Sequence, residues 1–422
     1  MLLSLLCAFA LYACTSSVPR PPGDKQAVPV APVILQPPGI SQPQGIPQPQ
    51  DASQPPVGLP PAPLVDEMLA PPAVVAEPPA PLLPSDGKAV PHIALLLPLK
   101  SAVFGSSAQA VQQGFLAAAN LKQRNLPVRI YADIDETSSV VGVYRQALAN
   151  GALAVVGPLT RDGVTALAAE QNIPVPTLAL NVVEGQAAPQ LYFFGLAAEA
   201  EARQIAQLGK RQGLNQAIVI ATRAQLSQRL QFAFEEAWHT SGGTILREIE
   251  FNDDPAVLAD ITYTPDTVVF LATNAEKARL IRPYLSNKLP VYATSQIFVG
   301  NDKTLTNYDL NGIRFVDAPW LLQPDHPAVM IYPRANPPLS VERERLYALG
   351  IDAYRLIQLL LANRVDGALL LDGVSGNIKL QGRVFQREPT LAVFQQGIAQ
   401  LSGAPSPVAV PEVFPGRMIS PP

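Results

Sequence analysis

The stretch His92-Ile-Ala-Leu-Leu-Leu-Pro-Leu99 and the stretch Gln109-Ala-Val-Gln-Gln-Gly-Phe-Leu-Ala-Ala-Ala-Asn120 decide the fold of this chain. The first is a short apolar run with a polar residue only at its edge, which predicts a strand buried on both faces. Pro98 ends that strand because proline cannot donate to a ladder. The second carries apolar residues at helical spacing and predicts an amphipathic helix. Together they form the opening half of a parallel βαβ unit.

The rest of the body repeats this alternation. A first run predicts strands at 128–133, 153–156, 175–180 and 191–194, and a second run predicts strands at 217–220, 244–251, 267–272, 290–294 and 312–316. The strand at 175–180 contains Pro176 and directly follows Pro174, and these prolines place it at the margin of its sheet. A long helix is expected over 340–363, followed by hairpin-like pieces at 376–380 and 382–385.

This order predicts an α/β protein with two doubly wound parallel-sheet lobes and a cleft between them. The domain is expected over residues 91–400, with one lobe at about 91–197 and 318–400 and the other at about 198–317. Residues 401–422 are expected to form a flexible tail.

Composition excludes several functions. The two cysteines, Cys7 and Cys14, precede the body, so the body has neither a disulfide nor a thiolate ligand. The three histidines are far apart and predict no zinc site. A net charge of -4 without a basic patch argues against nucleic-acid binding. No phosphate loop or other cofactor motif is present, and nothing in the sequence indicates an enzyme.

Residues 1–13 are apolar but too short to span a bilayer, and they resemble the hydrophobic core of a secretory signal peptide. Leu11-Tyr-Ala-Cys14 resembles a bacterial lipobox, so Cys14 is the predicted lipidation site and membrane anchor. The alternative is an ordinary cleaved signal with incidental cysteines. Thr15 follows the cysteine, and by resemblance to sorted lipoproteins this favours the outer membrane, facing the periplasm.

The segment 14–90 is dominated by Pro, Gln, Ala and Val and has few charges. Such a composition favours polyproline II and cannot bury enough surface to fold, so a disordered proline-rich tether is expected. Its length would let the globular body leave the membrane surface.

Several stretches of the body, taken in their order and spacing, carry a resemblance to a known family: Ile93-Ala-Leu-Leu-Leu-Pro-Leu99, Gln113-Gly-Phe-Leu116, Val156-Gly-Pro-Leu159, Val291-Tyr-Ala-Thr-Ser-Gln296, Asp309-Leu-Asn-Gly-Ile-Arg-Phe315, Pro319-Trp-Leu-Leu322 and Arg345-Leu-Tyr-Ala-Leu-Gly-Ile-Asp-Ala-Tyr354. Through them the body resembles the LppC/LpoA family of outer-membrane lipoproteins, within the type I periplasmic-binding-protein fold. The resemblance implies a regulator that binds and activates a class A penicillin-binding protein, a peptidoglycan synthase. The best-known members carry an N-terminal helical-repeat domain, where this chain has its proline-rich tether.

In solute-binding proteins of this fold, hydroxyls and main-chain amides at the carboxyl ends of strands hold a ligand in the cleft. The matching positions, which could bind a small polar ligand, are Ser101, Ser106, Thr160, Asn181, Ser295 and Gln296. The alternative is that they are ordinary loop and helix-capping residues, Thr160 above all. The rival function is a lipid-anchored receptor for branched-chain amino acids or amides that serves an ABC transporter.

Overall fold

The computed structural model describes residues 89–121, 126–132, 139–183, 185, 188–365 and 370–402, all within the unit formed by residues 81–422. The predictions for the signal peptide, for lipidation at Cys14, for most of the tether and for nearly all of the C-terminal tail lie outside these residues. None of the helices in the described part is long and apolar enough to cross a membrane.

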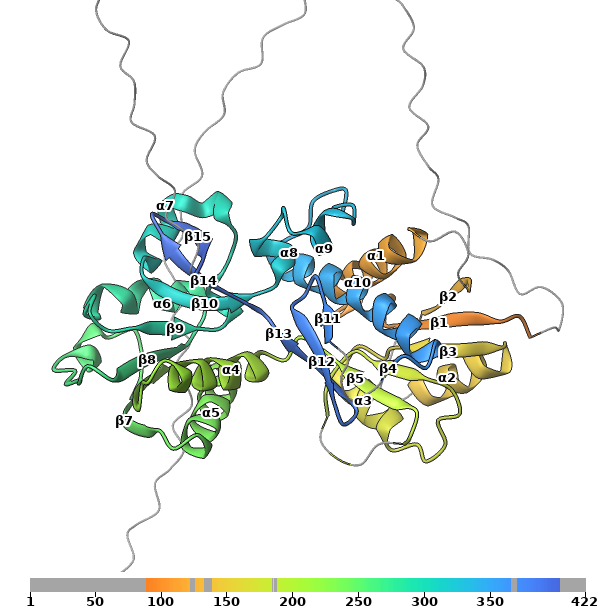
Figure 1. The fold of residues 1–422 in the computed structure, drawn as a ribbon, viewed down its shortest axis with the longest axis horizontal. Coiled ribbons are helices and arrows are strands. Elements are labelled where there is room, and N and C mark those ends of the chain that lie inside the picture. Colours follow the sequence, from red (N-terminus) through yellow and green to blue (C-terminus); the bar gives the residue numbers. More distant parts are fainter. Residues whose placement is uncertain are drawn as a thin grey trace, which may run out of the picture. The chain divides into compact units, whose positions relative to one another are not determined.

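The first lobe is built on an eight-stranded sheet of order β11-β12-β13-β5-β4-β3-β1-β2 (Figure 1). Its strands are β1 (His92–Leu97), β2 (Val128–Ala132), β3 (Ala152–Val156), β4 (Thr177–Ala179), β5 (Leu191–Phe194), β11 (Leu370–Asp372), β12 (Asn377–Gln381) and β13 (Val384–Glu388). From β2 to β13 all neighbouring strands are parallel, and β12 is antiparallel to both of its neighbours, β13 and β11. The helices that follow the first strands are α1 (Gly105–Asn120), α2 (Val140–Ala149) and α3 (Arg161–Ala168).

The second lobe has a seven-stranded sheet of order β15-β14-β10-β9-β8-β6-β7. Its strands are β6 (Gln216–Ala221), β7 (Thr244–Glu250), β8 (Thr267–Ala272), β9 (Val291–Ala293), β10 (Ile313–Asp317), β14 (Thr390–Gln395) and β15 (Ile398–Leu401). Its helices are α4 (Ala198–Arg211), α5 (Gln225–Thr240), α6 (Ala275–Ile281) and the short α7 (Thr304–Asn307). In both lobes the first five strands of the sequence lie across the sheet in the same order: the second, the first, the third, the fourth and the fifth. The predicted doubly wound pattern is therefore confirmed.

Within the described residues, the chain passes between the lobes three times. It crosses after β5, again after β10 through α8 (Pro319–Leu322) and α9 (Pro327–Met330) to α10 (Val341–Leu361), and finally between β13 and β14 (Figure 1). The last passage corrects the predicted lobe boundary. Residues 390–401 form β14, which pairs with β10, and β15, which pairs with β14, so they belong to the second sheet and not to the first lobe. Sequence periodicity could not reveal this, because it gives a strand but not its partner.

The strand at 175–180 is also placed differently from the prediction. β4 is an interior strand between β3 and β5. Pro174 and Pro176 precede its paired residues, and the Pro176 carbonyl accepts a hydrogen bond from the Val155 amide at 3.0 Å. Pro176 therefore supplies an acceptor at the start of an interior strand, a position where proline is tolerated.

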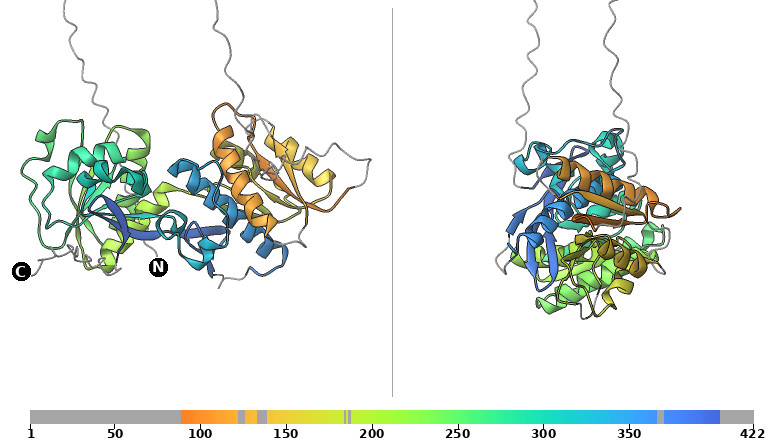
Figure 2. Two further views of the ribbon diagram at one scale, coloured as in Figure 1. Left: turned by 90° about the horizontal axis from the view of Figure 1, so that it is seen from above. Right: turned by 90° about the vertical axis from the view of Figure 1, so that its right-hand side faces the viewer.

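Strand β1 is buried on both faces, as predicted. Ile93, Leu95 and Leu97 face the core under α1 and α10, whereas Ala94 and Leu96 face the core under α2 and α3. The second lobe repeats this arrangement, with separate apolar cores on the two faces of its sheet. Helices therefore cover both faces of each sheet (Figures 1 and 2).

Helices α1 and α10 lie side by side on the first sheet and touch along their main chains (Figures 1 and 2). A Cβ atom added to Gly114 would lie 1.9 Å from the Tyr347 carbonyl oxygen. A Cβ atom added to Gly350 would lie 2.1 Å from the Val111 carbonyl oxygen. Two glycines, one on each helix, thus permit this close crossing.

The protonation of His92 is expected to make the stability of the fold depend on pH. Its ring is buried, with Nδ1 2.7 Å from the Val90 carbonyl oxygen and Nε2 3.0 Å from the Tyr131 hydroxyl. Burial lowers the pKa of His92 below 6.5, so the unfolded chain binds this proton more readily than the folded chain. We expect the free energy of unfolding to fall as pH falls from 6.5 through the folded-state pKa.

Urea denaturation at about pH 7.5 and about pH 5.5 checks this expectation in the parent protein and in His92→Gln. The variant should lose less stability between the two pH values than the parent does. An equal loss in both proteins would show that His92 does not carry the dependence.

Candidate functional site: the cleft between the lobes and its buried ion pairs

A cavity of about 950 Å³ opens between the two lobes at the carboxyl ends of the parallel strands. The first lobe contributes the loops after β1, β3 and β4, and the second contributes α4, α5 and the turn after β9. Polar and charged side chains line it beside apolar ones, and the polar ones are Ser107, Thr160, Arg161, Asp162, Asn181, Glu199, Arg203, Gln225, Gln228, Arg229 and Gln296.

Three of the six predicted ligand positions line this cavity: Thr160, Asn181 and Gln296. The Thr160 hydroxyl accepts a hydrogen bond from the Gly163 amide at 3.1 Å and caps α3. The Asn181 side chain donates to the Leu159 carbonyl at 3.3 Å and accepts from the Val182 amide at 2.9 Å. Both side chains therefore hold their own loops in place at the cavity wall.

The other three predicted positions lie elsewhere. Ser101 accepts hydrogen bonds from the amides of Val103 and Phe104 in the turn before α1. Ser106 is exposed on α1, and the next residue, Ser107, lines the cavity instead. Ser295 is buried and faces an ion-pair network through its main chain. The sequence predicts the loops that carry these residues, but it does not predict the direction in which each side chain points.

The charges on the second-lobe side of the cavity are paired with each other. Arg229 on α5 contacts Glu199 on α4 at 2.9 Å, and Arg203 contacts Glu236 at 3.3 Å. Exposed aromatic side chains line the cavity on both sides: Phe104 belongs to the first lobe and Phe232 to the second. In the described part of the chain, no three His, Cys, Asp or Glu side chains converge to hold a metal ion.

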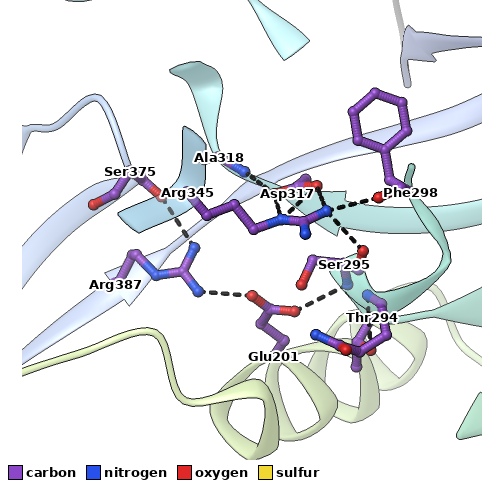
Figure 3. Close-up of polar contacts among 10 residues, drawn as sticks. Glu201, Thr294, Ser295, Phe298, Asp317, Ala318, Arg345, Ser375 and Arg387 are labelled. Carbon is purple, nitrogen blue, oxygen red and sulfur yellow. Dashed lines mark hydrogen bonds and ion pairs between the residues drawn. The ribbon is translucent and has the colours of Figure 1, made fainter. Parts of the chain in front are cut away.

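Two buried ion pairs lie where the chain passes between the lobes (Figure 3). Arg345 of α10 binds Asp317, at the end of β10, through Nη2 at 2.7 Å and Nε at 3.0 Å. The same Nη2 donates to the main-chain carbonyls of Ser295 at 3.0 Å and Phe298 at 2.9 Å. One guanidinium from the first lobe thus holds two segments of the second. Burial alone would lower the pKa of Arg345, but the Asp317 carboxylate raises it above its ordinary value.

The second pair joins Glu201, near the start of α4, to Arg387 at the end of β13, with 2.7 Å between Oε1 and Nη2. Glu201 also accepts from the Ser295 amide at 3.0 Å, and Arg387 donates to the Ser375 carbonyl at 3.0 Å (Figure 3). Both side chains are at least nine-tenths buried, with 4% and 6% exposed. Ser295 is therefore held through both its amide and its carbonyl.

The network continues into the first lobe at Asp352 on α10. Its carboxylate accepts from the amides of Val374 and Ser375 at 3.1 and 2.8 Å, from the Ser375 hydroxyl at 2.7 Å and from Arg355 at 2.9 Å. Burial raises the pKa of Asp352, and Arg355 and the Ser375 bonds oppose that rise. A continuous set of polar contacts thus runs from Ser295 in the second lobe to Arg355 in the first.

We name Glu201, Asp317, Arg345 and Arg387 the crossover network. Sequence reasoning did not find these residues. Their signal in the sequence is weak: Asp317 is a charge at the end of the apolar strand Ile313–Asp317, and Arg387 is the penultimate residue of the short strand Val384–Glu388. Glu201 and Arg345 fall in helices, where charges are usual.

Two α/β lobes with three crossings and a cleft at the carboxyl ends of their strands define the periplasmic-binding-protein class of fold. The sequence profile of the family described as "LppC putative lipoprotein" matches residues 81–266 and 260–397. Because this match covers well over half of the chain, the protein belongs to the LppC family. The resemblance predicted from the sequence is confirmed.

Three similar proteins illustrate the relationship. A penicillin-binding protein activator LpoA from Photobacterium profundum is 28% identical over 344 residues, covering 72% of this chain and 56% of the relative. The C-domain of LpoA from Haemophilus influenzae, described as a regulator of PBP1A, is 25% identical with a TM-score of 0.63, and the match covers 74% of this chain and 99% of that domain. A Chromobacterium violaceum structure described as a candidate branched-chain amino acid ABC transporter is 39% identical, with a TM-score of 0.63, covering 72% of this chain and all of that one. The chain spans about half the length of the curated relatives it matches.

Proposed function

We propose that this protein is an outer-membrane lipoprotein that binds and activates a class A penicillin-binding protein and thereby regulates peptidoglycan synthesis. The observation that carries the proposal is the match of residues 81–397 to the LppC family, whose relatives are named as penicillin-binding protein activators. The match to a whole regulator C-domain supports assigning the role to the two-lobed body.

In this proposal the protein acts by contact and catalyses nothing itself. The crossover network supports such a role, because it holds the lobes together through buried protein groups and needs no ligand. A fixed arrangement of the lobes would present the synthase with a preorganised docking face, which lowers the entropy lost on binding.

A purified class A synthase tests the proposal directly. The chain from Thr15 onward should capture the synthase in a pull-down and raise its rate of glycan polymerisation. Absence of both effects, with the protein folded by circular dichroism, would overturn the proposal.

The second candidate is a lipid-anchored receptor for branched-chain amino acids or amides of an ABC transporter. The similarity to the Chromobacterium violaceum structure favours it, as does a polar cavity with Gln296 in its wall. A receptor gains stability from its ligand by mass action. A rise in melting temperature with leucine or a related amide, together with no effect on the synthase, would select the receptor.

Anchoring through Cys14 is a further part of the proposal. In Cys14→Ala we expect the protein to move from the membrane fraction to the soluble periplasmic fraction, because the anchor requires the acylated thiol. Fractionation followed by immunoblotting measures this, and Cys7→Ala is the matched control that should stay with the membrane. A Cys14→Ala protein that also stays with the membrane would contradict the anchor.

A further inference from the structure

A second cavity, of about 570 Å³, lies in the second lobe at the other end of the sheet from the cleft. Its wall is formed by residues just before β9 and β10 and by the end of β14. Because the cleft lies at the carboxyl ends of the parallel strands, the two cavities are separated by the length of the sheet. We name this second cavity the basal pocket.

The basal pocket gathers positive charge. Arg282, Lys288 and Arg314 line it together with the amide side chains of Asn287 and Asn311 and two glutamines, and the described residues of its lining include no carboxylate. Among the described residues, none of the ion pairs within 4.0 Å involves these three cations. The crossover arginines, in contrast, each bind an acidic side chain.

Arg282 is half-buried, and its hydrogen-bond partners among the described residues are all neutral oxygens. Its guanidinium donates to the carbonyls of Asn311 and Leu285, both at 2.9 Å, and to the Asn287 side chain at 2.7 Å. Burial lowers the pKa of Arg282, since no acid compensates for the lost hydration. A bound anion would supply that missing charge.

The two arginines of the basal pocket are held in place by protein groups alone. Gly312, at a φ of 84°, leaves room for Arg282, since a Cβ atom there would lie 3.1 Å from Nη2. The Arg314 guanidinium lies over the ring of Tyr292 at 5.6 Å, and the Tyr292 hydroxyl donates to Gln212 at 2.6 Å. Both guanidinium groups are therefore preorganised, which reduces the entropy lost on binding.

We propose that the basal pocket is an oxyanion-binding site that takes a phosphate or carboxylate group. Arginine presents a planar fork of donors that matches two oxygens of either group, and the amide side chains suit the uncharged polar part of the same molecule. Neither the family match nor the proposed contact with a synthase accounts for this pocket.

Nuclear magnetic resonance on the full chain tests the proposal with two simple probes. Inorganic phosphate is followed by its ³¹P line width and trifluoroacetate, the carboxylate probe, by its ¹⁹F line width, both at constant ionic strength set with chloride. We expect saturable broadening of one or both lines. Broadening of the phosphate line alone identifies a phosphate site, and broadening of the trifluoroacetate line alone identifies a carboxylate site. Broadening of both lines identifies a general oxyanion site.

The double variant Lys288→Gln/Arg314→Gln should weaken the apparent affinity at least about tenfold, the change that corresponds to losing one charged hydrogen bond. Arg247→Gln is the matched control: it removes the same charge from another second-lobe arginine that bonds only main-chain carbonyls, outside the basal pocket. It should change the affinity less than twofold. If the double variant melts early, Lys288→Gln alone, at an exposed side chain, should still weaken the affinity more than Arg247→Gln does. Broadening that is absent from the parent protein, or equal in parent and double variant, would overturn the proposal.

Discussion

Gly350→Ala is expected to destabilise the first lobe strongly, although it adds only one methyl group. The new Cβ would lie 2.1 Å from the Val111 carbonyl oxygen and 2.8 Å from the Phe115 amide nitrogen, so α1 and α10 would have to move apart. Main-chain atoms cannot rotate away as a side-chain tip can. We expect the free energy of unfolding to fall by about 3 kcal/mol or more, the upper end of the range for overpacked cores.

Urea denaturation followed by circular dichroism measures this change, and Gly142→Ala is its control. Gly142 lies inside α2 with nothing within 4 Å of the added methyl group. There alanine should raise the free energy of unfolding by about 0.5–1 kcal/mol through helix propensity alone. The two variants should therefore change stability in opposite directions. If Gly350→Ala were as stable as the parent, the close helix crossing would be wrong.

This crossing gives a physical meaning to two stretches that the sequence singled out only by resemblance. Gln113-Gly-Phe-Leu116 and Arg345-Leu-Tyr-Ala-Leu-Gly-Ile-Asp-Ala-Tyr354 are more than 200 residues apart in the chain, yet their glycines meet at the contact of α1 with α10. Helical spacing predicted each helix correctly. It carries no information on which helix packs against which, so the pairing came only with the structure.

The fold class could be predicted because the interior strands of the parallel sheets are short apolar runs that alternate with amphipathic helices. β1 shows this best, since all six of its residues are buried. What failed was pairing: residues 390–401 were assigned to the wrong lobe, and β4 to a sheet margin. Both failures have one cause, since hydrogen-bond partners far apart in sequence leave no local pattern.

The sequence could predict which loops form the candidate site, but not where each side chain in them points. Thr160, Asn181 and Gln296 line the cleft because the carboxyl ends of parallel strands share one edge. Ser106 points elsewhere because it precedes Ser107 by one helical position, which turns a side chain by about 100°. The sequence could not reveal the crossover network. Its four residues come from four separate segments, which meet only where the chain passes between the lobes.

Asp317→Asn is the sharpest test of that network. The substitution keeps the shape of the side chain but leaves the Arg345 guanidinium, buried in the second passage, without its carboxylate. Removing one partner of a buried pair typically costs about 3–5 kcal/mol, and we expect a loss near the lower value because the carbonyls of Ser295 and Phe298 still accept from Arg345. The double variant Asp317→Asn/Arg345→Met should recover part of the loss, since no unpaired charge then remains.

The exposed pair of Arg203 and Glu236 provides the matched control, because 43% and 52% of its side chains are exposed. Glu236→Gln should change the free energy of unfolding by less than about 1 kcal/mol. Urea denaturation of the four variants, including Arg345→Met alone, yields the coupling energy between Asp317 and Arg345. A coupling no larger than that of a surface pair would mean that the passages are held by packing alone. A large coupling, with synthase activation lost in parallel, would tie the fixed arrangement of the lobes to the proposed function.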